Sequence, residues 1–153
     1  MAYYRKTQQY PGNRYTLIRD SVQQKKPFLI YNFRDPNQYK AFLYDLDKYG
    51  KLNYVLQTIH SYDNTFERKF QQPSIFVTNE DTDVSLEEFK KIAIGSLQHY
   101  RLDSVICLFE GKVAIFYKNG EHKVIGTEIF TTFDSSEFSG DYYQIGSNYY
   151  TFA

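Results

Sequence analysis

The sequence contains no tryptophan, a single cysteine and no excess of charge, because its 18 Lys and Arg are balanced by 18 Asp and Glu. With only Cys107 the chain has no internal disulfide, so nothing in it requires an oxidising compartment. It also lacks any run of about eighteen apolar residues, and no apolar stretch follows Arg5 and Lys6 near its start. We therefore expect no membrane span, no secretory signal and a cytoplasmic location.

Aromatic residues are abundant instead, with 16 Tyr and 13 Phe among the 153 residues. Each aromatic side chain buries a large area when it is packed, so a chain of this length is able to build a sizeable core as one domain. A bias toward Tyr, Phe, Lys, Gln and Asn is also typical of an AT-rich coding sequence. An exposed tyrosine is therefore not by itself evidence for a binding site.

Charge is unevenly distributed along the chain. Residues 1–40 hold eight Lys and Arg against two acids, whereas residues 127–153 hold four acids and no base. Tyrosines alternate with the first cations, a mixture suited to holding phosphates and stacking on bases. The residues that we predict to bind nucleic acid or a protein partner are Tyr3, Tyr4, Arg5, Lys6, Tyr10, Arg14, Tyr15, Arg19, Lys25 and Lys26. An ordinary solvated surface, or docking of the acidic end on this segment, are the alternatives.

The first predicted elements are a strand, a helix and a second strand. An aromatic, apolar run at residues 27–33 is typical of a central strand. Asp35 is a good N-cap and Pro36 suits the first helical position, which predicts a helix that ends before Gly50. Residues 52–61 are rich in β-branched and aromatic residues and predict the next strand.

A further strand and a second helix follow. The strand is expected over residues 66–78 with an interruption near Pro73. Ser85 and Glu88 have the spacing of a capping box, which predicts the start of a helix that ends near Leu102.

The remaining sequence predicts strands joined by short turns. Residues 104–109, 113–117 and 121–125 form a meander, with Asn119-Gly120 as the hairpin turn of its second pair. Residues 142–152 predict a last hairpin in the acidic part of the chain.

These elements predict an α+β fold with a ferredoxin-like β-α-β-β-α-β core, in which two helices cover one face of a mostly antiparallel sheet. A basic aromatic arm (residues 1–26), irregular or with a first strand at residues 14–19, would precede this core (residues 27–131). An acidic, Tyr-rich segment with extra hairpin strands (residues 132–153) would follow it. Such a plan hosts many functions, so the fold does not decide the activity.

The segment Phe28–Phe33 resembles the first of the two sequence signatures of RNA-recognition modules, through Asn32 and its apolar positions. The resemblance implies aromatic rings on an open sheet face where bases stack. Residues 66–77 depart from the family, because they lack the Gly-aromatic pattern of the second signature. A buried central strand is the alternative interpretation of Phe28–Phe33.

We expect no cofactor and no metal site. His60, His99 and His122 fall in three predicted elements without the spacing of metal ligands. Cys107 lies between apolar neighbours in a predicted strand, where burial opposes formation of a thiolate.

The strongest enzyme hypothesis is a metal-dependent nuclease, in which Asp103 and an acid-x-Lys pair hold a cation that activates water. The pairs are Glu110–Lys112 and Glu121–Lys123. Both pairs lie at hairpin turns, where solvation alone favours such residues.

The sequence therefore favours a non-enzymatic binding protein that engages nucleic acid, or a nucleic-acid-handling protein complex, through residues 1–26. Small aromatic proteins without motifs are frequent among the accessory proteins of phages and plasmids, which suggests a mobile genetic element. The first alternative is a protein inhibitor, for example of a host defence complex, or an assembly subunit that acts only by protein contacts, including a homo-oligomer. The nuclease is the second alternative.

Overall fold

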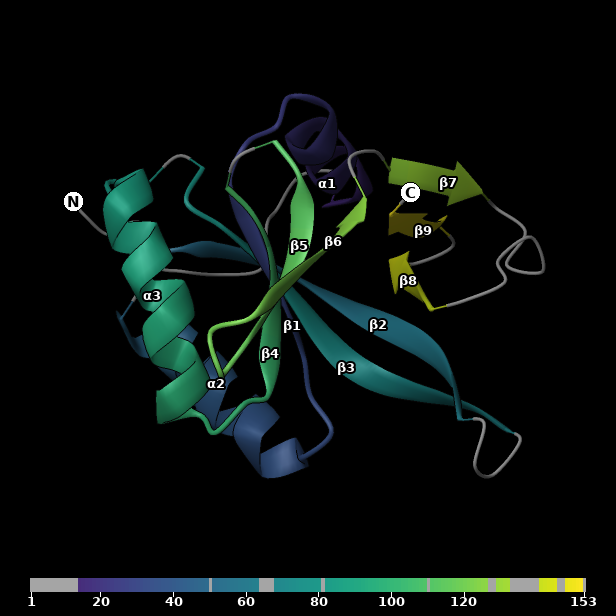
Figure 1. Cartoon of the computed structure of the whole chain (residues 1–153), viewed down its shortest axis with the longest axis horizontal. Helices are drawn as coiled ribbons and strands as arrows, with labels where there is room; N and C mark the ends of the chain where they lie inside the picture. The colour runs from purple at the N-terminus through teal and green to yellow at the C-terminus, as the bar shows by residue number, and fades with distance from the viewer. Residues whose placement is uncertain are drawn as a thin grey trace.

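The computed structural model describes residues 14–49, 51–63, 68–80, 82–109, 111–126, 129–132, 141–145 and 148–152. Within these residues the chain is an α+β fold with three helices and one nine-stranded sheet (Figure 1). The helices are α1 (Arg14–Gln23), α2 (Pro36–Tyr49) and α3 (Leu86–His99). The strands are β1 (Phe28–Asn32), β2 (Asn53–Asp63), β3 (Arg68–Thr78), β4 (Ser104–Leu108), β5 (Val113–Tyr117), β6 (His122–Gly126), β7 (Ile129–Thr132), β8 (Tyr142–Ile145) and β9 (Asn148–Phe152). The predicted α+β class is confirmed.

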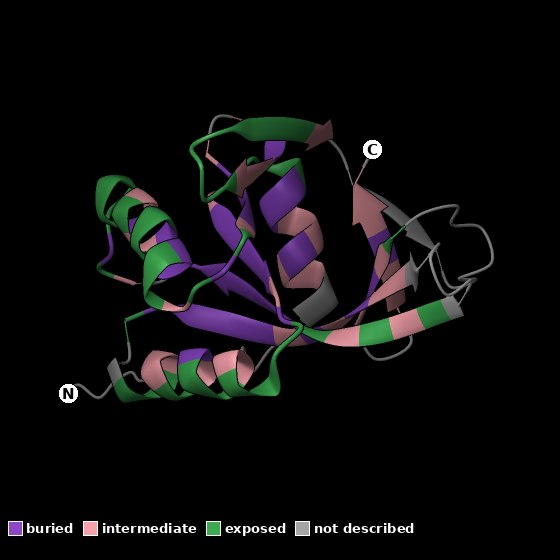
Figure 2. Ribbon diagram, turned by 60° about the horizontal axis from the view of Figure 1, so that its bottom comes forward, coloured by how far each residue is buried: buried purple, intermediate pink, exposed green. Residues whose placement is uncertain are grey.

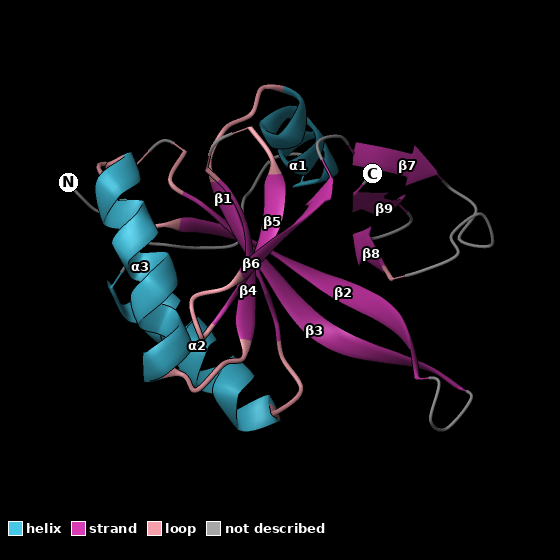
Figure 3. Ribbon diagram, viewed as in Figure 1, coloured by secondary structure: helices cyan, strands magenta, loops and turns pink. Residues whose placement is uncertain are grey.

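The strands pair antiparallel in the order β6-β5-β4-β1-β3-β2-β8-β9-β7. Side chains alternate along β1, so that Leu29 and Tyr31 join one buried cluster and Phe28 and Ile30 join another on the opposite face. Helices α2 and α3 pack on the first face (Figure 3). Helix α1 and the strands β8 and β9 pack on the second. Burial is greatest on the strands in the middle of the sheet (Figure 2).

Both long helices begin where the sequence predicts. The backbone N–H of Asn37 donates to the Asp35 carboxylate at 2.8 Å, which makes Asp35 the N-cap of α2. Ser85 caps α3 by accepting a 3.2 Å hydrogen bond from the backbone N–H of Glu88. The apolar faces of both helices then enter the same core.

The prediction of a break in β3 near Pro73 is wrong, because the strand continues through this residue. The Phe33 N–H donates to the Pro73 carbonyl at 3.1 Å, just beyond the last paired residue of β1, Asn32. The nitrogen of Pro73 points to the same side as its carbonyl, away from β2, so the missing N–H removes only the return bond to Phe33 at the end of β1.

The prediction of irregular structure or a strand at residues 14–19 is also wrong, because residues 14–23 form helix α1. Ile18 and Val22 are 0% and 1% exposed and lie one helical turn apart on the buried face. This single pair in a polar sequence is too short a repeat to indicate a helix. The helix covers the second face of the sheet instead of extending away from it.

The sheet curls into a half-barrel. Strands β6 and β7 occupy its two ends, although only residues 127 and 128 separate them in the chain. The Cα atoms of Gly126 and Ile129 are three steps apart and so lie within about 11 Å of each other. The two ends of the sheet are therefore drawn together around the second face.

Candidate functional site

An open groove lies between α3 and the strands β5 and β6, on the face that α2 and α3 cover. Neighbouring helices pack at about 8 to 10 Å, roughly twice the spacing of strands, so one helix covers about two strands. The strands β4, β1, β3 and β2 are matched by α2 and α3. Within the described residues, no helix covers β5 and β6 on this face (Figure 3). In the part of the chain that the structure describes, the third position of this layer of helices, over β5 and β6, is vacant.

The groove has a volume of about 570 Å³. Helix α3 forms one wall with Ala93, Ile94 and Leu97, and the strands form the floor. The floor residues are Val105 and Cys107 in β4, Ala114 and Phe116 in β5, and His122 and Val124 in β6. Ile94 is 68% exposed and Val124 is 48% exposed, so a large aliphatic side chain faces solvent on each side. Burial of such side chains is favourable, so the groove is a candidate contact site.

Cations line the groove as well. The Lys90 ammonium lies 5.7 Å from the centre of the Phe109 ring, in cation-π geometry. Lys112 lies in the turn between β4 and β5 and is exposed. The described lining residues include no acid. An apolar ligand with negative charge at its margins therefore fits this lining.

The groove shows no sign of nucleophilic chemistry in the residues described. Burial raises the pKa of the Cys107 thiol from 9.0 to about 12, so that the thiol stays protonated near neutral pH. The ring of His122 stacks on Phe116 with centroids 5.3 Å apart. Both side chains act here as packing groups of the floor.

Only part of the predicted binding segment lies in the described residues. Tyr3, Tyr4, Arg5, Lys6 and Tyr10 lie outside them. Arg14 and Tyr15 are the first two residues of α1.

The three remaining predicted residues lie in α1 or just after it. The Arg19 guanidinium is 3.2 Å from the Asp20 carboxylate, and the Lys26 ammonium is 2.9 Å from the Glu80 carboxylate. Lys25 is exposed and has a left-handed backbone, with φ of 55°. Two of the three described cations are thus already paired with acids.

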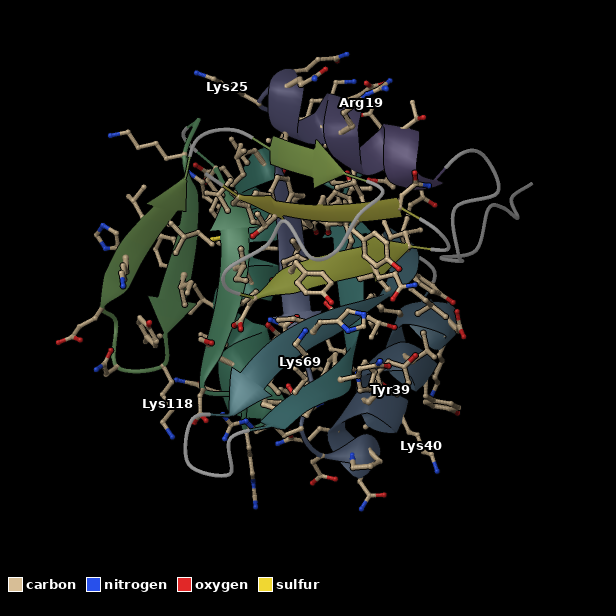
Figure 4. The ribbon with its side chains drawn as sticks, turned by 90° about the vertical axis from the view of Figure 1, so that its right-hand side faces the viewer. Arg19, Lys25, Tyr39, Lys40, Lys69 and Lys118 are labelled. Atoms are coloured by element: carbon tan, nitrogen blue, oxygen red, sulfur yellow. The ribbon has the colours of Figure 1, made fainter. Side chains whose placement is uncertain are left out.

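The described basic residues of the first forty do not gather on one surface. Arg19 and Lys25 lie together at one end of the molecule, and Lys40 lies at the other end (Figure 4). A single ligand surface that joins all of them is therefore not formed by this part of the chain. Binding by residues 1–26 stays a prediction.

The aromatic residues of β1 are not available to stack on bases. Phe28 and Tyr31 in β1, and Phe33 directly after it, are at most 1% exposed, because β1 lies in the middle of the sheet with both faces covered. The central-strand interpretation of this segment is the one that holds.

The other candidate chemical groups are dispersed. His60 is 2.7 Å from Gln144, and His99 is 3.9 Å from Asp45, on different elements. No group of three or more His, Cys, Asp or Glu among the residues placed in the structure is arranged to hold a metal ion. Asp103, assigned to a nuclease site by the second alternative, pairs with Lys118 at 3.2 Å on an exposed surface.

One residue of the groove carries a signal in the sequence, although none of the predicted site residues lies there. The buried face of α3 uses Phe89, Ala93 and Leu97. Ile94 falls outside this face and is nevertheless apolar, so it is a surplus hydrophobic residue on a surface helix. The position of β6 beside it follows only from the tertiary structure.

Comparisons with family models, curated proteins and solved structures find no match for this chain. In the described part of the chain, no helix is both long and apolar enough to cross a lipid bilayer.

Proposed function

We propose that the protein is a non-enzymatic binding module that acts by protein contact, and that its groove takes an amphipathic helix with acidic margins from a partner. The observation that carries this proposal is the vacant third position in the layer of helices over β5 and β6. Helix-in-groove binding is a common mode of peptide recognition, in which spaced apolar side chains fill such a groove. The inhibitor and assembly-subunit alternatives both act by this kind of contact.

Two properties of the groove support this occupant. A helix in the vacant position would bury Ile94 and Val124 together with the Phe116 ring, and aliphatic and aromatic side chains at the centre of a contact supply most of its affinity. Lys90 and Lys112 would face the margins of that helix, where acidic side chains complement them. A basic helix would meet like charge.

A designed peptide tests the proposal directly. The probe is a helix of about 18 residues with a leucine stripe and glutamate margins, and the matched peptide carries lysine margins on the same stripe. We expect the glutamate peptide to bind and to weaken with salt, and Ile94→Lys to reduce its affinity about tenfold or more. Tyr44→Lys is the control, because Tyr44 is 63% exposed on α2 and lies outside the groove.

Failure of both peptides to bind would contradict the proposal. So would an equal loss of affinity in the Ile94→Lys and Tyr44→Lys variants, because the contact would then not lie at the groove. If the protein prefers the lysine peptide, the partner helix does not have the acidic margins that we propose.

Binding of nucleic acid is the second candidate function, and the uneven distribution of charge in residues 1–40 supports it. Such binding weakens linearly in the logarithm of affinity with the logarithm of salt concentration. We expect Arg5→Ala, Lys6→Ala and Arg14→Ala to make this dependence shallower. No binding of single- or double-stranded DNA or RNA at low salt would rule this function out.

We also propose a ferredoxin-like unit at the centre of the fold. The order β4-β1-β3-β2 within the sheet, with α2 and α3 on one face, supports it. In this proposal the strands β5 and β6 extend the unit on one side and β8, β9 and β7 on the other. The groove would then lie over the first extension.

A further inference from the structure

A separate cavity lies inside the curl of the sheet, on the face opposite the groove. Its volume is about 310 Å³, near the lower end of the range for small-molecule sites. Ile106 and Ile115 line it from β4 and β5, and Tyr143 and Phe152 line it from β8 and β9. Segments from both ends of the sheet therefore enclose the same space.

The wall has an apolar part and a polar part, and the polar part consists of Asn32, Ser104, Asp141, Tyr143 and Thr151. Its apolar residues are Ile30, Ile59, Ile106, Ile115, Ile125 and Phe152. Five branched aliphatic side chains and one aromatic ring favour the transfer of an apolar group from water into this cavity.

A chain of hydrogen bonds leads to the polar part of the cavity. The Tyr150 hydroxyl donates to Oε1 of Gln57 at 2.6 Å, and Nε2 of Gln57 donates to the Ser74 hydroxyl at 3.1 Å. Ser74 in turn donates to Oδ1 of Asn32 at 2.7 Å. Nδ2 of Asn32 reaches the Tyr143 hydroxyl oxygen at 3.5 Å, the limit of a hydrogen bond. The carboxamide of Asn32 is thereby fixed with its nitrogen on the Tyr143 side.

Two hydrogens at the end of this hydrogen-bond chain remain for a ligand. Tyr143 is 4% exposed, and its hydroxyl hydrogen has no acceptor among the residues described. Burial raises the pKa of Tyr143, and the charge of Asp141 adds to this shift, so the hydroxyl keeps its proton. Asn32 has a second amide hydrogen that the described residues also leave free. The Tyr143 hydroxyl is the buried one of the two, and a buried donor is costly unless an acceptor reaches it.

Asp141 also lines the cavity and is exposed, and its charge acts on the Tyr143 hydroxyl. It adds an acceptor and a negative charge near the two donors. A head group that fits must accept hydrogen bonds from Asn32 and Tyr143 and donate one to Asp141. A carboxylate has no hydrogen to donate, and Asp141 repels its charge.

We propose that this cavity binds a small uncharged molecule with an apolar body and a primary amide head. The amide carbonyl accepts from Asn32 and Tyr143, and the amide nitrogen donates to Asp141. The apolar body lies against the isoleucines and Phe152. This inference is independent of the groove, because the two sites lie on opposite faces of the sheet.

The test compares two probes of equal shape on the full chain. Hydrocinnamamide has the proposed head, and hydrocinnamate has a carboxylate in its place. We expect hydrocinnamamide to bind at least about tenfold more tightly than hydrocinnamate, with resonance shifts at the methyl groups of Ile106 and Ile115. Asp141→Asn should raise the affinity for hydrocinnamate and reduce the difference between the probes.

Tyr143→Phe removes only the hydroxyl and should weaken hydrocinnamamide about tenfold, the factor expected for one lost hydrogen bond in a buried site. Tyr44→Phe on α2 is the matched control and should leave binding unchanged. If Tyr143→Phe does not fold, Asp141→Asn still decides, because Asp141 is exposed. Absence of binding, as from a cavity that holds only water, would overturn the proposal. So would equal affinity for the two probes.

Discussion

The hydroxyl of Tyr150 in β9 donates a 2.6 Å hydrogen bond to Oε1 of Gln57 in β2, and both side chains are buried. The two residues are 93 positions apart in the sequence. Because an unpaired polar group in this position is costly, the bond favours the placement of β9 over the second face of the sheet. The curl of the sheet thus depends on a polar contact as well as on apolar packing.

Removal of this hydroxyl should destabilise the fold. Tyr150→Phe keeps the ring in the core and leaves the Gln57 oxygen without its donor, so we expect a loss of about 1 to 3 kcal/mol in the free energy of unfolding. Tyr149→Phe is the matched control at the neighbouring position, which points to the other side of β9. Urea denaturation of both variants measures the difference, and equal stabilities would contradict this role of the hydroxyl.

Two glycines should respond in opposite ways to alanine. Gly95 lies within α3, and apart from its chain neighbours and the nearby backbone of the helix no atom lies within 4 Å of the position that a Cβ would take. Gly95→Ala should therefore stabilise the protein by about 0.5 to 1 kcal/mol, through the higher helix propensity of alanine. Gly120 has a φ of +90°, which alanine rarely adopts, so Gly120→Ala should be destabilising. Thermal unfolding of both variants measures these changes, and a change of the same sign in the two variants would contradict the prediction.

Stability should fall in alkaline solution. Burial raises the pKa of Tyr31, Tyr143 and Tyr150 above their ordinary value of 10.0, and that of Cys107 from 9.0 to about 12. The folded chain keeps these protons at a pH where the unfolded chain has lost them. The resulting stability is complete below about pH 9 and is lost as the pH rises through the folded values, at about 1.4 kcal/mol per pH unit for each group.

Urea denaturation over a series of pH values measures this slope. Cys107→Ala removes one titrating group, so between about pH 9 and 12 the free energy of unfolding should fall less steeply by the contribution of that group. This change in slope does not depend on how the substitution affects packing. Tyr44→Phe is the matched substitution at an exposed tyrosine, since Tyr44 is 63% exposed. A stability that does not fall above about pH 10 would contradict the burial of these groups.

The local parts of the fold were predictable because their signals are local. Asp35 and Ser85 cap the helices through hydrogen bonds to residues two or three positions away. The Asn119-Gly120 turn joins β5 to β6, and Gly120 takes the left-handed position of the loop with a φ of +90°. The last predicted hairpin is also confirmed, since β8 pairs with β9.

The parts that depend on distant contacts were not predictable in this way. Helix α1 has one pair of fully buried apolar residues, Ile18 and Val22. These two residues pack in a cluster whose other members lie on strands distant in the sequence. Strand β7 pairs with β9, so its short segment has no hairpin partner beside it in the sequence. The groove arises because α3 and β6 become neighbours only after the sheet has formed. The cytoplasmic location stays a prediction.

The most direct test of the proposed function is a reversal of charge at the groove. Lys90→Glu combined with Lys112→Glu changes two residues of its lining and none of its apolar floor. The affinities of the glutamate and lysine peptides for this variant and for the unaltered protein are measured at low salt. We predict that the variant prefers the lysine peptide, whereas the unaltered protein prefers the glutamate peptide. An unchanged preference in the variant would contradict the account.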